Sequence, residues 1–529
     1  MTQHYCTTSV AVPFGRFATV LVRILRCGDR SAGLRWLLLL AGYLLLASYP
    51  VLAGGQVQAA EPEAGFFAAQ GCFAGEATTT SVLLQTRLTA IPGPQLDGDG
   101  DVPGRAGLVR FQWSDRDLLE LDDESQIRTG DWLPATASSD FIVRQRLDDL
   151  QPDTRYYYRA QFSPYPGQPW QDVGIRNGVV GSFRTLGGAE KSDTLTFCMG
   201  SCMNYYAFMS GKPNGGGPVT ATDEDKRLGY PVFRHLHEEC PDFFIGTGDI
   251  VYYDHPGKSP ARERSELLKK WHEQFRFPRL VEFFSRTTSF WSKDDHDFRF
   301  NDADLKNRQL PTAETGIDLF RLQMPIVPSG NKTAPTYRTR RPHRDLQLWF
   351  LEGRDYRSPN RMDDGPEKSI WGTAQKAWLQ ETLRSSDAKW KILISPTPMV
   401  GPDRASKRDN HTNPRGFRHE GEAFMRWLND EGIEGVIIFC GDRHWQYHSI
   451  HPSGLEEFCC GALNDENAIR GTYPGDKGSN DPEAKIEQPY HYGKPSGGYL
   501  KAVVTGDGKL AVELKDDEGK VGYRIEMER

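Results

Sequence analysis

The alternation of apolar and polar positions divides the chain into two regions. From 64 to 188, short runs of β-branched and aromatic residues alternate with polar ones, as at 81–86, 107–113 and 156–162, and clusters of turn-forming residues separate them. A period of two residues between turns is typical of half-buried strands. We therefore predict that 64–188 is a β-sandwich domain, with a linker at 186–188.

From residue 194 onward, apolar runs alternate with amphipathic segments. Because strands that alternate with helices indicate an α/β domain, we predict such a domain over 192–515. The chain returns to strand-like runs near its end, which we expect to complete a sheet edge. The predicted strands are 194–200, 242–246, 287–291, 346–351, 390–394, 435–440, 499–504 and 510–514, and the predicted helices are 230–238, 373–383 and 422–428.

The first 59 residues have the pattern of an export signal. Several arginines precede the apolar run 36–47, and small residues follow it, so that both 51–53 and 57–59 are acceptable cleavage sites. We predict a signal peptide and leader over 1–59 and a secreted protein, in the periplasm, the cell envelope or outside the cell. The alternative is an uncleaved N-terminal membrane anchor, since no charged residue occurs from 36 to 60.

Composition narrows the class of protein. The 529 residues are 38% hydrophobic and 26% charged, with a net charge of −7, as in globular proteins of two domains. The basic residues form no block, so we predict no nucleic-acid-binding surface. Nine cysteines include Cys6 and Cys27 in the leader, which leaves seven; this odd number and their spacing do not indicate a disulfide framework.

Five predicted strands end in chemically active residues. In α/β sheets, functional groups gather at the carboxyl ends of the strands. Each motif alone has an ordinary explanation, such as a core thiol, a helix cap, an acidic turn or a core histidine, but all five together predict a metal site. The strand ends lead to Cys202, to Asp249 and Tyr252, to Asp294–Asp297, to Ser395–Thr397, and to Asp442 and His444. An acidic turn at Asp97, Asp99 and Asp101 is interpreted as solvated, with calcium binding as the alternative.

The order of these motifs resembles the calcineurin-like metallophosphoesterases, and most closely the alkaline phosphatase D (PhoD-like) family. The resemblance covers about 65–510. It implies a four-layer α/β/β/α sandwich preceded by a fibronectin type III-like β-sandwich. The motifs are Gly-Ser-Cys at 200–202, Gly-Asp-x-x-Tyr at 248–252, Asp-Asp-His-Asp at 294–297 with Asn301-Asp302, Gly-Arg-Asp-Tyr-Arg at 353–357, Gly-Asp-Arg-His at 441–444 and the loop at 409–413.

The resemblance also implies metal ligands. Asp249 would be the carboxylate that bridges two metals, and Cys202, Tyr252 and His444 would bind the first. A thiolate together with a phenolate suits Fe3+. Asp295 and Asp442 would bind the second metal, and ligation by oxygen alone favours Ca2+.

Three further residues are candidates for catalysis by resemblance. His296 would protonate the leaving alkoxide, and Arg354 and Arg357 would neutralise charge on the phosphoryl oxygens. The alternative for the two arginines is a pair of surface salt bridges.

The sequence departs from the superfamily in two places. Related enzymes supply a histidine to the second metal after the strand at 390–394, where Ser395-Pro396-Thr397 has none. Either Asn410 or His411 replaces it, or the second site is rich in oxygen and weak; Asn301 is a further candidate for this metal or for substrate. Lys293 stands where an aromatic residue is commoner. Insertions at 205–228 and 464–490 are expected either to cover the site or to be disordered.

The sequence thus predicts an exported phosphoric ester hydrolase, a phosphatase or phosphodiesterase that acts through a hydroxide bound to two metals. The alternatives are a diesterase specific for envelope polymers or phospholipids, and a catalytically inactive cell-surface binding protein. The natural substrate and the oligomeric state stay open.

Overall fold

The computed structural model describes residues 65–166, 174–306, 308–328, 330–331 and 333–529. The predicted leader lies outside these residues. Within them, no helix combines the length and apolar character needed to cross a bilayer.

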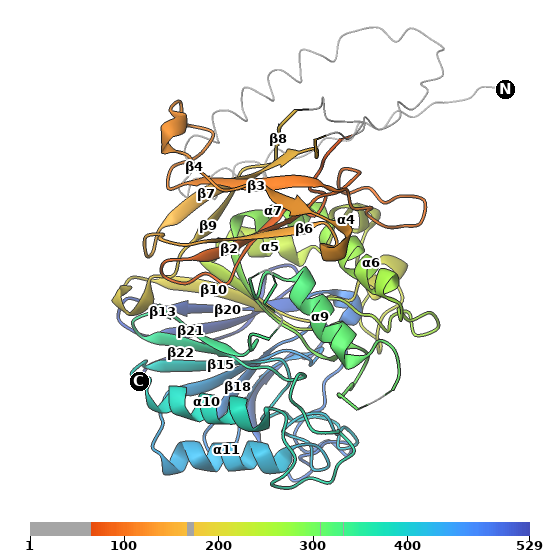
Figure 1. Ribbon diagram of the computed structural model, residues 1–529. Helices are drawn as coiled ribbons and strands as arrows, with labels where there is room; N and C mark the ends of the chain where they lie inside the picture. The colour runs from red at the N-terminus through yellow and green to blue at the C-terminus, as the bar shows by residue number, and fades with distance from the viewer. Residues whose placement is uncertain (1–64, 167–173, 307, 329, 332) are drawn as a thin grey trace, which may run out of the picture. The chain divides into compact units, whose positions relative to one another are not determined.

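Two large mixed sheets pack against each other (Figure 1). Within the described residues the first has nine strands, in the order β22 (Val521–Met527), β21 (Leu510–Asp516), β20 (Gly498–Val504), β10 (Leu195–Gly200), β11 (Phe243–Thr247), β12 (Thr288–Ser292), β1 (Cys72–Gly75), β2 (Val82–Arg87) and β6 (Ile142–Leu147). The second has seven, in the order β13 (Arg338–His343), β14 (Leu346–Phe350), β15 (Trp390–Ser395), β16 (Val436–Cys440), β18 (Glu456–Cys460), β17 (Gln446–Ile450) and β19 (Glu487–His491).

The central strands of both sheets are buried on both faces, which explains their continuous apolar runs. In β10, Phe197 and Met199 face the second sheet, whereas Cys198 faces the helices. The rings of Phe197 and Phe439 lie 6.1 Å apart across the two sheets. Strands β10, β11 and β12 are parallel, as are β14, β15 and β16, so each set ends at a common edge.

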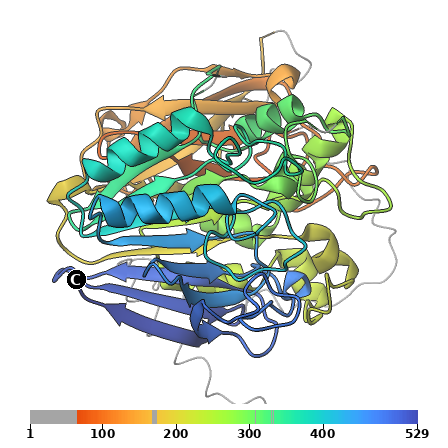
Figure 2. The ribbon, with the colours of Figure 1, turned by 90° about the horizontal axis from the view of Figure 1, so that it is seen from below.

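Helices cover the outer faces of the sheets. On the second sheet lie α10 (Gly372–Arg384) and α11 (Arg418–Asp430), side by side in Figure 1 and Figure 2. On the first sheet pack α3 (Tyr205–Ser210), α5 (Val232–Glu239), α6 (Arg264–Phe275), α7 (Pro278–Arg286) and α9 (Ala313–Gln323). Helix α4 (Asp223–Leu228) contacts α7, and the short, buried α8 (Asp295–Phe298) contacts α9. The α/β/β/α layering is therefore confirmed.

The N-terminal strands form the predicted sandwich, but one of its sheets continues into the α/β region. Strand β1 pairs in parallel with β12, which joins β1, β2 and β6 to the first large sheet. The facing sheet has the order β4-β3-β7-β8, with β5 paired to β3 and β9 to β7. Its members are β3 (Gly107–Ser114), β4 (Arg128–Thr129), β5 (Leu133–Ala135), β7 (Arg155–Ser163), β8 (Arg176–Asn177) and β9 (Gly181–Arg184), and short 3-10 turns occur at Glu124–Gln126, Ala137–Ser139, Gly188–Glu190 and Asp465–Asn467.

The acidic turn at 97–101 contacts α6. Asp101 Oδ1 lies 2.7 Å from His272 Nδ1, and Asp140 Oδ2 lies 2.8 Å from His272 Nε2. Arg87 pairs with the other oxygen of Asp140 at 3.0 Å. Burial alone would lower the pKa of His272, but the two aspartates raise it above its ordinary value. The turn therefore joins the sandwich to α6 through a charged histidine.

This histidine predicts a pH-dependent stability. A raised pKa in the folded state gives a stabilisation that is complete below the unfolded pKa of about 6.5 and is lost as pH rises through the folded pKa. Replacing His272 by Gln should therefore lower the free energy of unfolding by about 3 kcal/mol at pH 6 and by less at pH 9. Urea unfolding across this range measures the difference. His237→Gln, at a more exposed position of α5, is the control; the same loss for His272→Gln at every pH would contradict the prediction.

Candidate metal centre

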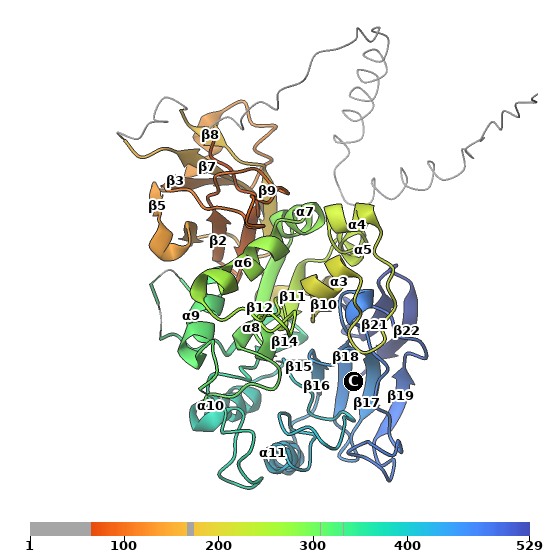
Figure 3. The ribbon, with the colours of Figure 1, turned by 90° about the vertical axis from the view of Figure 1, so that its right-hand side faces the viewer.

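The ends of the central strands of the two sheets lie close together (Figure 3). Cys202, Asp249, Asp295, Asp442 and His444 follow these strands and belong to groups whose ligand atoms lie within 4.8 Å of one another. Strand β10 leads to Cys202 and β11 leads to Asp249, both from the first sheet; β16 leads to Asp442 and His444, from the second. A Cβ on Gly441 would lie 2.4 Å from Thr247 Oγ1 and 2.6 Å from Ser201 Oγ. The sheets approach so closely here that only glycine fits.

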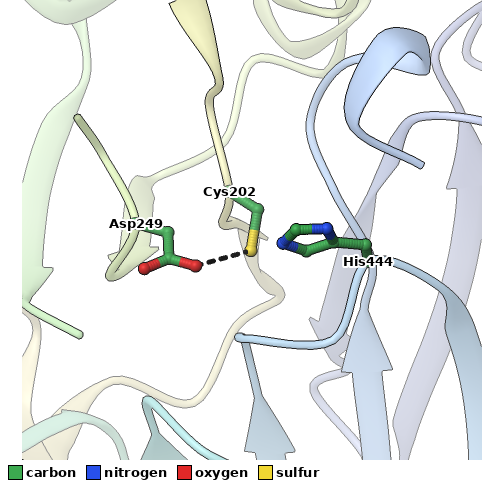
Figure 4. A group of neighbouring side chains, drawn as sticks. All are labelled: Cys202, Asp249 and His444. Atoms are coloured by element: carbon green, nitrogen blue, oxygen red, sulfur yellow. Dashed lines mark hydrogen bonds between the residues drawn. The ribbon is translucent and has the colours of Figure 1, made fainter. Parts of the chain in front are cut away.

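A thiol, a carboxyl, a phenol and an imidazole form the first group. Cys202 Sγ and the Tyr252 hydroxyl each lie 3.3 Å from Asp249 Oδ2. The same hydroxyl lies 3.3 Å from His444 Nε2. Figure 4 shows Cys202, Asp249 and His444 pointing toward one another. One sulfur, one oxygen and one nitrogen ligand atom, from Cys202, Asp249 and His444, thus lie within 4.8 Å of one another.

The backbone at these residues is strained. Cys202, Asp249 and Asp442 have φ angles of 60°, 55° and 61°, in the left-handed region that costs a non-glycine residue about 1–3 kcal/mol. Gly248 has φ 96°, and a Cβ there would lie 2.6 Å from the Asp294 side chain. Each strand therefore turns sharply at its end, and this turn directs the next side chain into the site.

Four carboxylates form a second group. Ligand oxygens of Asp249, Asp294, Asp295 and Asp442 lie within 4.8 Å of one another. Asp294 was not predicted as a ligand; Arg354 Nε donates to its Oδ1 at 2.7 Å. Among the described residues, Asp294 Oδ2 and Asp295 Oδ1 are buried without a hydrogen-bond partner. Asp249 belongs to both groups, so one carboxylate is within reach of both sets of ligand atoms.

A third acidic group adjoins the second. Asp295, Asp302 and Asp409 also bring ligand oxygens within 4.8 Å. Lys407 forms an ion pair with Asp302 and lies 3.8 Å from Asp409 Oδ2. Burial and neighbouring Asp409 raise the pKa of Asp302 to about 7. The loop at 409–413 was identified from the sequence only as a family motif. The position of Asp409 in the sequence did not predict that its side chain lies near Asp295.

The pKa values of these groups test whether the site fits cations. Burial raises the pKa of Asp249 and Asp294 well above the usual carboxyl range, and the charge of Asp295 adds to both. Burial and Asp249 also raise the pKa of the Cys202 thiol and the Tyr252 phenol. Cations would compensate these crowded negative charges and stabilise the deprotonated donors. The residues therefore fit one metal with S, N and O ligands and another with oxygen alone.

His296 lies beside both groups. Its Nδ1 is 2.7 Å from Asp254 Oδ1, and its ring stacks on Tyr252 at 4.2 Å. Burial would lower the pKa of His296, but Asp254, Asp295 and Asp249 raise it well above its ordinary value. The backbone N–H of Asn301 donates to the other oxygen of Asp254 at 2.9 Å. Asp254, which was not predicted although it is two residues past Tyr252, thus orients His296 and favours its protonated form.

Both candidate arginines are buried, which excludes the surface salt bridges. Arg354 pairs with Asp294 and lies 3.9 Å from Asp295. Arg357 donates to the carbonyls of Gly353 and Asp409 at 2.8 Å each. Arg354 therefore contacts the carboxylates directly, whereas Arg357 holds the loop that carries Asp409.

Two other sequence candidates have different partners. Asn410 Nδ2 donates to Asp403 at 2.9 Å. His411 Nε2 lies 3.0 Å from Glu420, and its ring lies 4.7 Å from Trp371. Within the described residues, His411 belongs to none of the groups of His, Cys, Asp and Glu side chains that could hold a metal.

The two insertions cover the first group. Asn467 Nδ2 donates to the Tyr252 hydroxyl oxygen and to the Cys202 carbonyl, both at 2.9 Å. Asn214 Nδ2 lies 3.3 Å from His444 Nδ1 and 3.2 Å from Asn467 Oδ1. The expectation that these insertions lie over the site is therefore confirmed. Neither asparagine was predicted, because an insertion rich in Gly, Asn and Asp does not show which asparagine points inward.

Comparison with known protein families gives two matches. Residues 197–507 match the model for the PhoD-like phosphatase, and residues 55–187 match that for the PhoD-like phosphatase N-terminal domain. Among curated proteins, alkaline phosphatase D of Bacillus subtilis (strain 168) is 22% identical over 451 residues. The alignment covers 72% of this chain and 64% of that relative.

Two solved structures share the fold. The structure of PhoD superposes with a TM-score of 0.63 at 20% identity, covering 87% of this chain and 89% of that one. The purple acid phosphatase PPD1 from yellow lupin (Lupinus luteus) seeds gives a TM-score of 0.53 at 12% identity, covering 87% of this chain and 74% of that one. At these identities the likeness is one of fold.

Proposed function

We propose that this chain, which belongs to the PhoD-like phosphatase family, is a metal-dependent hydrolase of phosphate esters. The observation that carries the proposal is the sharing of Asp249 between a thiol–phenol–imidazole group and a group of carboxylates. Two adjacent cations bridged by one carboxylate are the arrangement that phosphoryl transfer to water uses in other hydrolases.

The two groups of ligands select different cations. Cys202, Tyr252 and His444 offer a strongly donating set that suits Fe3+. Asp294, Asp295 and Asp442 offer only oxygen, which suits a hard cation such as Ca2+. When bound, the pair would activate water and neutralise the phosphoryl oxygens.

The protein's own residues would do the rest. His296, held protonated by Asp254, is placed to give its Nε2 proton to the leaving oxygen. Arg354 lies beside Asp294 and Asp295, where its charge would stabilise the developing negative charge of the transition state. Asn467 and Asn214 would fix Tyr252 and His444 and, with their insertions, exclude water from the first group.

Metal analysis with a substrate panel tests the proposal. Protein purified without chelator should contain iron and calcium, and chelator should abolish hydrolysis because the ligands then lose their shared cations. Restoring the metals should restore activity. A comparison of p-nitrophenyl phosphate with bis-p-nitrophenyl phosphate separates a monoesterase from a diesterase. Unchanged turnover by metal-free protein would contradict the proposal.

We also propose export, on the basis of the basic residues and the apolar run at 23–47. N-terminal sequencing of the mature protein distinguishes a cleaved signal, with a new terminus near residue 54 or 60, from an uncleaved anchor.

A further inference from the structure

A buried ion pair joins the two sheets beside the metal centre. Lys293 directly follows β12 of the first sheet, and its side chain is 1% exposed. Its ammonium donates to Glu352 Oε2 at 2.7 Å and lies 2.5 Å from Asp355 Oδ1. Glu352 is two residues beyond the end of β14, in the second sheet. The ammonium thus connects the same two strand edges that supply the predicted metal ligands.

The contact closes a ring. Glu352 Oε1 accepts the backbone N–H of Arg354 at 2.8 Å, and Arg354 Nε donates to Asp294 Oδ1 at 2.7 Å. Asp294 is the next residue after Lys293, so the ring returns to its starting point. The Thr336 hydroxyl also donates to Glu352, at 2.6 Å. Every member is buried, which makes the geometry strongly dependent on each partner.

The ring includes a member of the carboxylate group. Asp294 and Asp295 belong to this group together with Asp442 from the other sheet and with Asp249, which the first group shares. Within the described residues, no hydrogen bond or ion pair joins Lys293, Glu352 or Arg354 to the thiol, phenol or imidazole of the first group. Replacing Lys293 should therefore displace the carboxylates of the second group more than the thiol, phenol and imidazole of the first group.

We propose that Lys293 is a positioning residue for the second metal. By holding Glu352 and Asp355, it fixes Arg354 against Asp294 and so sets the separation of Asp295 from Asp442. This inference rests on the proposed metal-dependent function. Without the ammonium, Glu352 and Asp355 would face each other as buried carboxylates, with Arg321 3.8 Å from the other oxygen of Asp355, and their repulsion would displace the loop that carries Arg354.

The test compares two buried lysines. Lys293→Met removes the ammonium at nearly constant volume. Lys191→Met is the matched control: Lys191 is 6% exposed, lies 3.1 Å from Asp153 and 2.7 Å from Asp193, and precedes the amino end of β10, away from the metal centre. For each full-length, iron-loaded variant, calorimetry gives the Ca2+ affinity, and urea unfolding gives the stability. Visible absorption reports the iron–phenolate and iron–thiolate bonds.

Lys293→Met should bind Ca2+ about 10–100-fold more weakly, the usual effect of losing a residue that orients metal ligands, while iron content and the absorption band match the wild type. Lys191→Met should lose stability but keep its Ca2+ affinity. Equal Ca2+ affinities in the two variants, or a parallel loss of iron in Lys293→Met, would overturn the inference.

Two further measurements complete the test. If Lys293→Met does not fold, Glu352→Gln keeps the side-chain volume but replaces one accepting oxygen by a donating amide, and should weaken Ca2+ binding in the same direction; wild-type affinity in that variant would overturn the inference. Wild-type protein that binds no cation would instead refute the proposed function. The two failures are thus distinguishable.

Discussion

Replacing Asp249 by Asn should remove both metals and reduce kcat/KM by about 10⁴-fold or more. Asp249 Oδ2 lies 3.3 Å from both the Cys202 sulfur and the Tyr252 oxygen, and the same carboxylate belongs to the group with Asp295 and Asp442. The loss of two cations removes several kcal/mol of transition-state stabilisation, which corresponds to a rate effect of this order. Elemental analysis and steady-state kinetics on one preparation measure both effects.

The same strand supplies a control for this variant. Asp242 lies at the amino end of β11, where its Oδ2 accepts the Thr196 N–H at 2.9 Å, and Asp249 follows the carboxyl end. Asp242→Asn should retain both metals and nearly full activity, because this carboxyl lies at the opposite end of β11 from the site. An Asp249→Asn protein that still holds both metals would exclude a bridging role.

Replacing His296 by Gln should lower kcat for alkyl phosphates by about 10²–10³-fold. The reason is that an alkoxide leaves slowly unless a proton reaches it, and Asp254 holds His296 in its protonated form. For p-nitrophenyl phosphate, whose leaving group needs no proton, the decrease should be much smaller. Kinetics with both esters give the ratio, and metal analysis shows whether the cations are retained.

His411→Gln is the matched comparison. The sequence made this histidine a candidate for the second metal, but the structure places its Nε2 against Glu420. This variant should decrease both rates equally, if at all. Equal decreases for the two esters in His296→Gln would mean that His296 does not supply the leaving-group proton.

The fold was predictable because its signals are local. A central strand buried on both faces, such as β16, is an uninterrupted apolar run, and an amphipathic helix such as α10 has a 3.6-residue period. The continuation of the first sheet into the sandwich was not predictable. It depends on the pairing of β1 with β12, more than 200 residues away in sequence, and the residue pattern of a strand does not predict which other strand it pairs with.

The candidate ligands were predictable for a related reason. Cys202, Asp249 and His444 each follow a recognisable strand, and the carboxyl ends of parallel strands meet at one edge. Asp254, Asp409 and Asn467 lie instead on loops or turns. Loop residues have no periodicity, so their side chains are placed by contacts that the linear sequence does not encode.

The sequence by itself therefore determined the β region, the α/β region and the order of the polar residues that follow the strands, because each depends on short segments. The four layers followed from the family resemblance that those residues carry. Only the tertiary structure decided which oxygens share a site, that His411 turns toward Glu420 instead of the carboxylates, and that Lys293 ties one sheet to the other. Those outcomes depend on distances between segments far apart in the chain, and they are fixed only when the two sheets pack together.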